Sequence, residues 1–402
     1  MHRKILFLST HNLATNPRLV KEIELALVNG FGVTAICFEF DNWSQPLNEK
    51  IKQRLVSKIN YHGIPGNRKP FLPWFISSLV FSLSKILLNL FPKDVFLLSL
   101  KSNKRSWLLL RQLKNNNEKF DLVIAHNPGS FYPALRFARK NEIPFGIDLE
   151  DYHPGETNNK REMLHAKNLN KAILPKANYV TAASPLILEY SEADLKIPLK
   201  NKEVILNYFI EEEFIEPGNK SSEKLRLVWF SQNINTGRGL EAILPVIKNH
   251  EEELELHFFG HSNPDFFERE LKGFQNVILH EPLPQAQLHK ELSCFDIGLA
   301  IEPAKDLNNE LALSNKILAY FQAGLYILAS DTKAQKEFIN EYPEHGIAVP
   351  LSFEKLEKAL IQLIDQKKFF RDTAKKRFEK AGGSNWENES KKLVEIWRQT
   401  WS

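Results

Sequence analysis

Residues 310–331, ELALSNKILAYFQAGLYILASD, join a helical run directly to an apolar one. Ser314 precedes the helical run, Lys316 lies in its first turn, and Gly324 ends it. The apolar run 326–329 follows after one residue. A helix that leads into a short apolar β-rich run is typical of parallel sheets covered by helices. This stretch therefore predicts an α/β fold.

The same alternation extends along the chain and occurs in two halves. Apolar β-rich runs alternate with helical patterns, which predicts two Rossmann-like domains of the α/β class. Ligands bind beyond the carboxyl ends of parallel strands, so we expect a cleft between the strand-end loops of the two domains. The expected strands are 5–9, 33–40, 121–126, 144–150 and 179–184 in the first half, and 225–231, 254–260, 276–282, 295–302, 326–329 and 346–351 in the second.

Domain boundaries follow from a charged segment in the middle of the chain. IEEEFIEPGNKSSEKLR (210–226) is rich in charge and contains Pro-Gly, as linkers do. We therefore expect an N-terminal domain over 1–209, a linker over 210–224 and a C-terminal domain over 225–382. The remaining residues, 383–402, are expected to form a helix that packs back on the N-terminal domain.

Composition places the chain among globular proteins. Of its 402 residues, 43% are hydrophobic and 25% are charged, and the net charge of +4 gives no reason to expect nucleic acid as a partner. Cys37 and Cys294 both lie in apolar runs, which favours buried thiols in a reducing compartment. The apolar run 5–8 is too short for a signal peptide. A cytoplasmic protein is expected, working at the inner face of the cytoplasmic membrane if it meets a membrane.

Two cations stand at predicted helix starts in the second half. Arg238 lies between Gly237 and Gly239, directly before a helix, and Lys316 lies in the first turn of another helix. Glycines let a backbone approach an anion, and a helix N-terminus adds partial positive charge. Such cations suit a phosphate group. The alternative for each is a solvated side chain in an ordinary turn.

Several motifs, taken in order, resemble the retaining family 4 of GT-B glycosyltransferases (glycosyl transferases group 1). The second half carries FSQNINTGRGLEAI, HFFGH, NVILHEPLPQAQLHKELSCFDIGLA and LSNKILAYFQAGLYILASD. The first half adds FLSTHNLATNPRLVKEIELALVNGFGVTAI, DLVIAHNP, DLEDYHPGE, ANYVTAASPLI and VILNYF. The resemblance spans nearly the whole chain and implies a GT-B enzyme that transfers a sugar from a nucleotide-diphosphate-sugar.

The resemblance implies a donor site in the second domain, without a metal or other cofactor. Arg238 stands where the family has a diphosphate-binding Lys, and it is expected to hold the diphosphate together with Lys316. Two departures stand out: Gln232 replaces a common Arg, and Ala319 replaces the glutamate that binds the ribose hydroxyls. The expected donor-binding residues are Gly237, Arg238, Gly239, Gly260, Glu310, Ser314, Asn315 and Lys316.

A cluster of acidic residues and one histidine follows a predicted strand in the first half. The segment 148–156, DLEDYHPGE, could orient sugar hydroxyls or stabilise positive charge at the anomeric carbon. One histidine among carboxylates is a weak metal signal; the alternative is a solvated acidic loop. With Arg238 and Lys316, the expected catalytic residues are Asp148, Glu150, Asp151 and His153. The expected acceptor-binding residues are Asn12, Asn16, Arg18, His126, Asn127 and Glu156.

An apolar, basic insertion over 70–115 interrupts the α/β rhythm. Residues 71–91 predict an amphipathic helix that contains too many polar residues to cross a bilayer. Residues 93–119 carry seven basic and two acidic side chains, which suits an anionic membrane surface. Contact with a membrane would favour a lipid-linked acceptor; the alternative is a helix that covers its own sheet. Its expected apolar face comprises Phe75, Leu79, Leu83, Ile86, Leu87 and Leu90.

Three functions remain open at this level. The favoured one is a glycosyltransferase that acts on a cell-envelope glycan or lipid-linked acceptor, retaining the configuration of the sugar. In such enzymes the departing phosphate of the donor can take the acceptor's proton, so no protein base is expected. A nucleotide-sugar 2-epimerase of the same double fold is the rival enzyme. A catalytically silent GT-B protein in an assembly complex is the third, because Ala319 and Gln232 remove two expected donor contacts.

Overall fold

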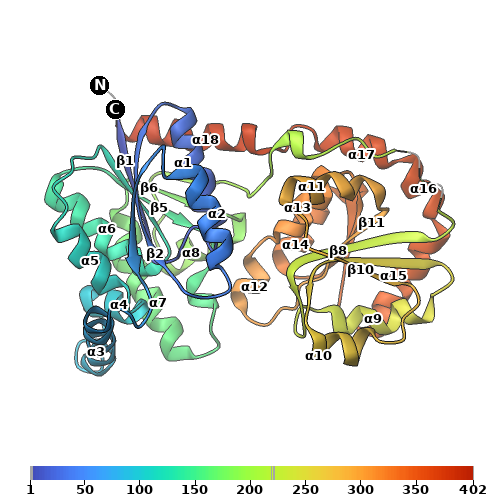
Figure 1. Cartoon of the computed structure of the whole chain (residues 1–402), viewed down its shortest axis with the longest axis horizontal. Coiled ribbons are helices and arrows are strands. Elements are labelled where there is room, and N and C mark those ends of the chain that lie inside the picture. The colour runs from blue at the N-terminus through green and yellow to red at the C-terminus, as the bar shows by residue number, and fades with distance from the viewer. Residues whose placement is uncertain (1–2, 219, 221, 402) are drawn as a thin grey trace. The chain divides into compact units, whose positions relative to one another are not determined.

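The computed structural model describes residues 3–218, 220 and 222–401, and it divides the chain into two compact units. The first unit runs to Leu206 and takes in the chain from Ser390 onward, and the second covers Asn207–Glu389. Each unit is a parallel sheet with helices on both faces, as Figure 1 shows. The predicted fold class, with two Rossmann-like domains, is confirmed.

Within its described residues, the first unit has a seven-stranded parallel sheet of order β3-β2-β1-β4-β5-β6-β7. The order turns back between β1 and β4, which pair from Ile5–Leu122 to Ser9–His126. This is the switch point at which such sheets bind ligands. The strands are β1 Lys4–Ser9, β2 Gly32–Glu39, β3 Asn60–Pro65, β4 Leu122–His126, β5 Phe145–Leu149, β6 Tyr179–Ala182 and β7 Lys202–Val204.

Helices of the first unit begin with clear sequence signals. Asn16 caps α1 by accepting the Leu19 N–H at 3.0 Å, and Pro17 occupies the first helical position. The insertion forms three helices, α3 to α5. The helices are α1 Pro17–Val28, α2 Gln45–Leu55, α3 Phe71–Leu87, α4 Val95–Ser102, α5 Ser106–Lys114, α6 Pro128–Asn141, α7 Lys160–Ile173 and α8 Pro185–Leu195.

The second unit repeats this plan with a six-stranded parallel sheet, counted over its described residues, of order β10-β9-β8-β11-β12-β13. Its switch point lies between β8 and β11. The central strands β11 and β12 are buried on both faces, which explains their continuous apolar runs. The strands of this sheet are β8 Leu225–Ile234, β9 Leu254–Ser262, β10 Val277–His280, β11 Ile297–Ala300, β12 Tyr326–Ser330 and β13 Gly346–Val349.

Close approach of α13 to β11 depends on a glycine. A Cβ on Gly298 would lie 2.2 Å from the ring of Tyr320, whose hydroxyl donates to the Val228 carbonyl at 3.2 Å. The helix therefore rests directly on the central strands. The helices of this unit are α9 Leu240–Asn249, α10 Pro264–Phe266, α11 Gln285–Glu291, α12 Leu307–Leu311, α13 Asn315–Gln322, α14 Lys333–Glu341, α15 Phe353–Asp365, α16 Lys367–Asp372 and α17 Ala374–Ala381.

The segment expected as a linker, 210–224, packs on the second unit where it is described. A short 3₁₀ turn at Glu211–Glu213 places the Glu213 carboxylate 2.6 Å from His289 Nδ1. Lys220 pairs with the Asp296 carboxylate at 3.6 Å. Residues 219 and 221 of the expected linker lie outside the described residues.

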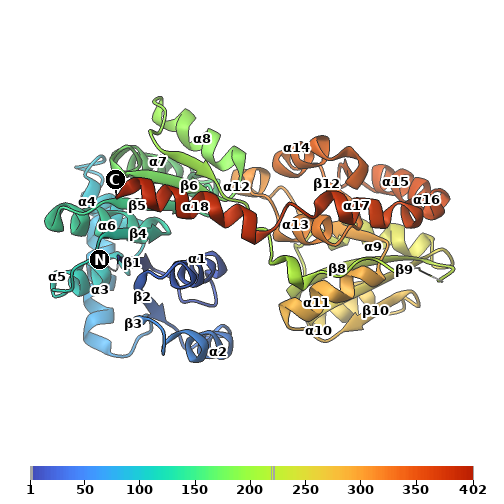
Figure 2. The same ribbon diagram turned by 90° about the horizontal axis from the view of Figure 1, so that it is seen from above.

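The last helix, α18 Trp386–Thr400, supplies a large core side chain to the first unit. Trp397 is fully buried, donates its indole N–H to the Tyr179 hydroxyl at 3.0 Å, and meets the ring of Phe7 edge-on. Trp401 donates to the Asp121 carbonyl at 3.1 Å. Figure 2 shows α18 running beside β6. The carboxyl-terminal residues of this chain thus complete the core of its first unit.

Replacing Trp397 tests this contribution. We expect Trp397→Ala to lower the free energy of unfolding of the first unit by about 3–5 kcal/mol, because it leaves a cavity and an unpaired Tyr179 hydroxyl. Urea denaturation followed by circular dichroism measures the change. Arg398→Ala, at the next, exposed position, is the control and should have little effect. Equal stability of the two variants would contradict this account.

Candidate functional site

A polar pocket of about 440 Å³ opens at the carboxyl edge of the second unit's sheet. It is formed by the turn between β8 and α9, the end of β9, and the loop that follows β11. Its size falls within the range of small-molecule sites, and its position beside the switch point suits a ligand. The lining residues are Asn233, Asn235, Thr236, Gly237, Arg238, His261, Ser262, Asn263 and Lys305.

Two glycines shape the turn at the base of this pocket. Gly237 and Gly239 have φ of +77° and +83°, in the left-handed region that side chains strongly disfavour. Gly239 is the residue that precedes α9, so the helix N-terminus begins at the pocket. The Gly237 N–H donates to the Glu241 carboxylate of the first helical turn. The expected close turn before a helix is therefore present, and one of its amide donors is already paired.

Positive charge gathers on two sides of the pocket. Arg238 is exposed on the turn, and within the described part of the chain its side chain has no hydrogen bond or ion pair. The Lys305 ammonium lies 3.0 Å from where a Cβ on Gly237 would stand, so the two cations share one small space. His261 adds an imidazole to the same wall. This lining attracts an anionic group.

Ser262 adds a donor that has no partner. Its hydroxyl oxygen is buried and makes no hydrogen bond within the described residues. A buried hydroxyl without a partner carries a desolvation cost that a ligand can remove by bonding to it. Neither Ser262 nor Lys305 was expected from the sequence. The only signal for either was its position just after a predicted strand.

Lys316 is engaged elsewhere and does not line this pocket. Its ammonium lies 2.5 Å from the Glu302 carboxylate, and the Ser314 hydroxyl donates to the same carboxylate oxygen at 3.0 Å. Ser314 also caps α13 by accepting the Lys316 N–H. Glu302, just beyond the end of β11, thus neutralises the cation. The structure brings Arg238 together with Lys305, while Lys316 as a diphosphate ligand stays a prediction that would require sharing its ion pair.

The remaining expected donor residues have structural roles in this unit. Glu310 accepts the Lys333 N–H at 3.0 Å, at the start of α14. Gly260 lies near the end of β9, where a Cβ would collide with the Ser231 carbonyl at 2.0 Å. Asn315 is exposed at the start of α13, and Ala319 is fully buried in it. Gln232 is exposed near the end of β8.

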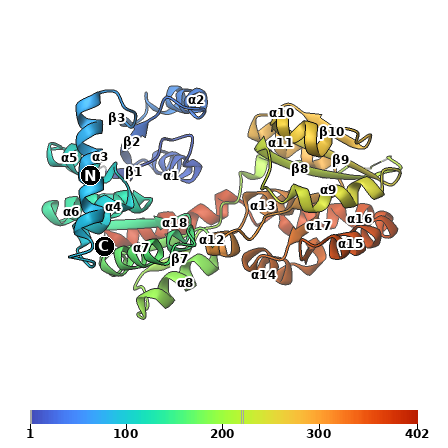
Figure 3. The same ribbon diagram turned by 90° about the horizontal axis from the view of Figure 1, so that it is seen from below.

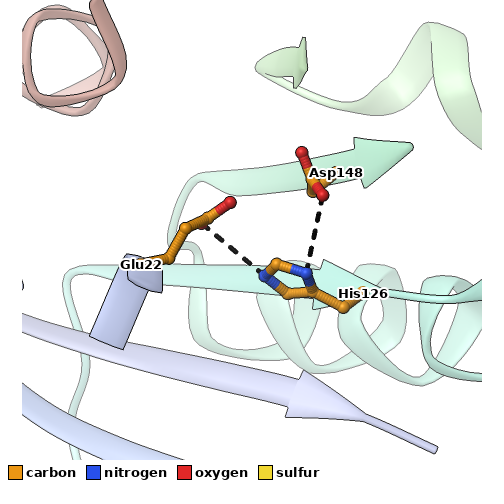
Figure 4. Close-up of side chains that lie close together, drawn as sticks. All are labelled: Glu22, His126 and Asp148. Atoms are coloured by element: carbon orange, nitrogen blue, oxygen red, sulfur yellow. Dashed lines mark ion pairs between the residues drawn. The ribbon is translucent and has the colours of Figure 1, made fainter. Parts of the chain in front are cut away.

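The first unit contains a chain of four buried charged or ionisable groups. Arg18 donates to both oxygens of Asp148, at 2.6 and 2.8 Å, and its other nitrogen donates to the Ile205 carbonyl. His126 lies 3.6 Å from Asp148 on one side and 3.6 Å from Glu22 on the other. Figure 4 shows the two carboxylates facing opposite nitrogens of the imidazole. All four side chains are 1% exposed.

Burial and the neighbouring charges shift the pKa values of these four buried groups. Burial opposes the charge on Asp148, but the Arg18 guanidinium lowers its pKa overall. Burial likewise opposes charge on His126, yet Glu22 raises its pKa. Burial raises the pKa of Glu22. Burial thus favours the neutral form of Glu22, while Arg18 and Asp148 form a hydrogen-bonded ion pair that can be accommodated in an apolar interior.

This row of buried ionisable groups is a poor fit for a metal ion. Glu22, His126 and Asp148 offer three ligand atoms within 4.8 Å of one another. The carboxylates approach different ring nitrogens, however, and both Asp148 oxygens already accept hydrogen bonds from Arg18, with Thr181 donating to one of them at 2.5 Å. A cation would have to displace these donors. The geometry is that of a buried ion-pair chain.

Several expected acceptor-binding residues, and the expected catalytic residue Asp148, are therefore internal. Arg18, Asp148 and His126 belong to the buried chain. Asn16 caps α1, and Asn12 donates to the Ser44 hydroxyl at 2.7 Å. These side chains hold the strand ends of the first sheet in place. Glu22 was missed from the sequence, where a glutamate inside a helical pattern carries no signal.

The other expected residues form a more accessible network at the same edge. Asn127 accepts from the Ser9 hydroxyl at 2.8 Å and contacts His11 Nδ1 at 3.3 Å. His153, in a 3₁₀ turn at His153–Gly155, lies 3.1 Å from the exposed Glu156 carboxylate. His153 Nε2 is buried and makes no hydrogen bond within the described residues. Glu150 and Asp151 follow β5 and are half-buried.

Burial and nearby negative charge on Asp151 and Asp148 raise the pKa of Glu150 to about 7. Burial lowers the pKa of His11 to about 4, aided by Arg105 and His153. A carboxyl group that changes charge near neutral pH can accept or donate a proton under working conditions. The network therefore combines several polar groups with one carboxyl that titrates near neutral pH.

Glu150 should make stability depend on pH. Its folded pKa of about 7 exceeds its ordinary value of 4.5, so its contribution to stability is greatest below pH 4.5 and is lost as pH rises through 7. Glu150→Gln removes this loss. We expect the variant to gain stability relative to the unchanged protein between about pH 5 and pH 8. Urea denaturation across this range measures the difference, with exposed Glu189→Gln as the control; parallel curves for Glu150→Gln and the unchanged protein would contradict the prediction.

Residues 230–366 match the family model described as glycosyl transferases group 1, so the resemblance to group 1 glycosyl transferases is confirmed for this part of the sequence. The matched region contains the polar pocket. No curated protein sequence matched the chain.

Solved GT-B structures share the fold of the chain. HepE of Anabaena in complex with UDP is 12% identical, with a TM-score of 0.68 over 99% of this chain and 100% of that one. A glycosyltransferase from Rickettsia africae ESF-5 is 15% identical, with a TM-score of 0.65 over 99% and 98%. The lipopolysaccharide outer core galactosyltransferase WaaB is 14% identical, with a TM-score of 0.64 over 98% and 99%. At these identities the likeness concerns the fold alone.

Proposed function

We propose that the protein is a glycosyltransferase that moves a sugar from a nucleotide-diphosphate-sugar to a cell-envelope glycan or lipid-linked acceptor, with retention of configuration. The observation that carries the proposal is the cationic pocket at the start of α9, inside the region that matches group 1 glycosyl transferases. HepE, which shares the fold, was solved with UDP.

The pocket suits the diphosphate of such a donor. Arg238 can present a bidentate fork to one phosphate, and Lys305 can place a compact charge beside it. As the bond to the sugar breaks, negative charge grows on the departing diphosphate, and fixed cations stabilise that charge more than the ground state. Positive side chains suffice for this role, so the proposal needs no metal or other cofactor. The retaining outcome belongs to the proposal as well.

The acceptor is proposed to bind the strand-end network of the first unit. Glu150, Asp151 and Glu156 offer carboxylates to sugar hydroxyls, and His153 brings a buried ring nitrogen without a partner. A glycan acceptor suits this set because it presents many hydroxyl donors. WaaB, whose name gives lipopolysaccharide as its product, shares the fold. A cytoplasmic site of action, at the inner face of the membrane, fits this choice of acceptor.

The decisive experiment separates transfer from its two rivals. The purified protein is incubated with a panel of nucleotide-sugars, with and without lipid-linked glycan acceptors, and the products are followed by mass spectrometry. Transfer predicts nucleotide diphosphate release together with a heavier acceptor. Conversion of the donor sugar without an acceptor would point to an epimerase. Absence of both reactions and of calorimetric binding would favour a silent GT-B protein, and either result would overturn the proposal.

Donor affinity should depend on both pocket cations. We expect Arg238→Ala and Lys305→Ala each to weaken binding of the preferred nucleotide-sugar by about 10- to 100-fold, as loss of a charge-assisted hydrogen bond does. Isothermal titration calorimetry measures the dissociation constants. Lys248→Ala, at the opposite end of α9, is the matched control and should bind normally. Unchanged affinity in both pocket variants would exclude this pocket as the diphosphate site.

A further inference from the structure

Helix α3 of the first unit carries its large apolar side chains outward. The alternative, a helix whose apolar face covers its own sheet, does not fit: the six residues predicted to share one apolar face are all exposed. Exposure rises to 62% at Ile86 and 71% at Leu90. Phe71 and Leu72 extend the apolar surface at its start. The six residues are Phe75, Leu79, Leu83, Ile86, Leu87 and Leu90.

The inner side of α3 contains two buried serines. Ser77 and Ser84 lie seven residues apart, and the helix packs against α4. Their hydroxyls donate to carbonyls of the same helix, Ser77 to Trp74 at 2.9 Å and Ser84 to Phe81 at 2.7 Å. Because these hydroxyls are satisfied within the helix, they can be buried at little cost. Trp74 and Phe81 are half-buried, and Leu88, just after the helix, is 1% exposed. The helix is thus attached through serines and apolar side chains, while its six-residue apolar face stays exposed among the described residues.

Basic side chains flank this apolar surface. Arg68 and Lys104 lie over the Trp74 ring at 5.4 and 6.0 Å, and Lys85 lies over the Phe81 ring at 4.2 Å. Arg161 bonds to Asn89 beyond the end of the helix. The sequence between residues 50 and 117 contains thirteen lysines and arginines and a single acidic residue. Of these, Arg68, Lys85 and Lys104 contact aromatic rings of α3 and place positive charge beside the apolar surface.

We infer that α3 docks the protein on an anionic lipid bilayer, lying in its surface. Figure 3 shows the helix, in blue, on the outside of the first unit. Apolar side chains enter the boundary between headgroups and acyl chains, while flanking lysines and arginines meet anionic headgroups. The helix lies on the bilayer and does not cross it: within the described residues no helix is long and apolar enough to span a membrane. The inference is independent of the proposed transfer reaction.

The charge around the apolar surface selects this partner. An apolar face alone would suit a second copy of the chain or another protein equally well. A second copy would bring an equally basic rim against this one, which like-charge repulsion disfavours. An anionic bilayer offers an apolar phase for the exposed side chains and, at its surface, negative charge for the lysines and arginines.

Vesicle sedimentation with the full chain tests the inference. The unchanged protein should bind vesicles of phosphatidylcholine with phosphatidylglycerol and bind pure phosphatidylcholine far less. Leu79→Ser/Leu83→Ser should weaken binding to the anionic vesicles by about tenfold or more. Lys85→Gln/Lys93→Gln should weaken it about fivefold per charge and reduce its dependence on salt. All these side chains are exposed, so thermal unfolding should be unchanged.

The matched control places the same change on an exposed helix of the second unit. Phe353 and Ile361 of α15 are 48% and 43% exposed, and Phe353→Ser/Ile361→Ser should bind like the unchanged protein. Three results would overturn the inference: no binding by the unchanged protein, equal binding to neutral vesicles, or equal loss in control and α3 variants. A dimer in sedimentation velocity that Leu79→Ser/Leu83→Ser dissolves would assign the face to a second copy instead.

Discussion

The parallel pairing of β8 with β11 is the constraint on which the candidate donor pocket depends. These strands meet where the order of the sheet reverses, so the loops that follow them diverge. The turn after β8 brings Arg238, and the loop after β11 brings Lys305. Neither cation is near the other in sequence. Only the strand order brings them to one pocket. Gly237 and Gly239 adopt positive φ in the turn, and the missing Cβ of Gly237 leaves room for the Lys305 ammonium.

Charge in the two units is managed in different ways. In the first unit, Arg18 and Asp148 neutralise each other inside the protein, where an unpaired charge would be costly, and His126 and Glu22 lie beside them. In the second, the Lys316 ammonium is neutralised by Glu302, whereas Arg238 remains exposed on its turn. Lys316 could therefore hold a phosphate only by sharing its ion pair with Glu302.

Much of the fold could be predicted from the sequence because buried parallel strands carry continuous apolar runs. The expected runs 5–9, 225–231 and 254–260 correspond to β1, β8 and β9. Two strands gave no such signal. β3 and β7 lie at the edges of the first sheet and are largely accessible, so their residues are polar. The turn with Gly237 and Gly239 was predictable because its conformation requires glycine.

The site was less predictable, because partners far apart in sequence decide what each side chain does. Glu302 forms an ion pair with Lys316, fourteen residues later in the sequence, and Arg18 pairs with Asp148, 130 residues later. Lys305 and Ser262 have no distinguishing neighbours in sequence, yet the fold places both in the pocket wall. The amphipathic pattern of α3 gave the apolar face correctly. A pattern alone, however, does not say whether that face looks inward or outward.

The side of α3 that packs on the first unit and the side that faces outward consist of different residues. The side that packs on the first unit contains buried Ser77 and Ser84 with half-buried Val80 and Phe81, and a different set of side chains is exposed to the surroundings. Substitutions on the outward side leave the packed side intact. Evolution could therefore adapt the outward side to a different environment, one residue at a time, without an unstable intermediate.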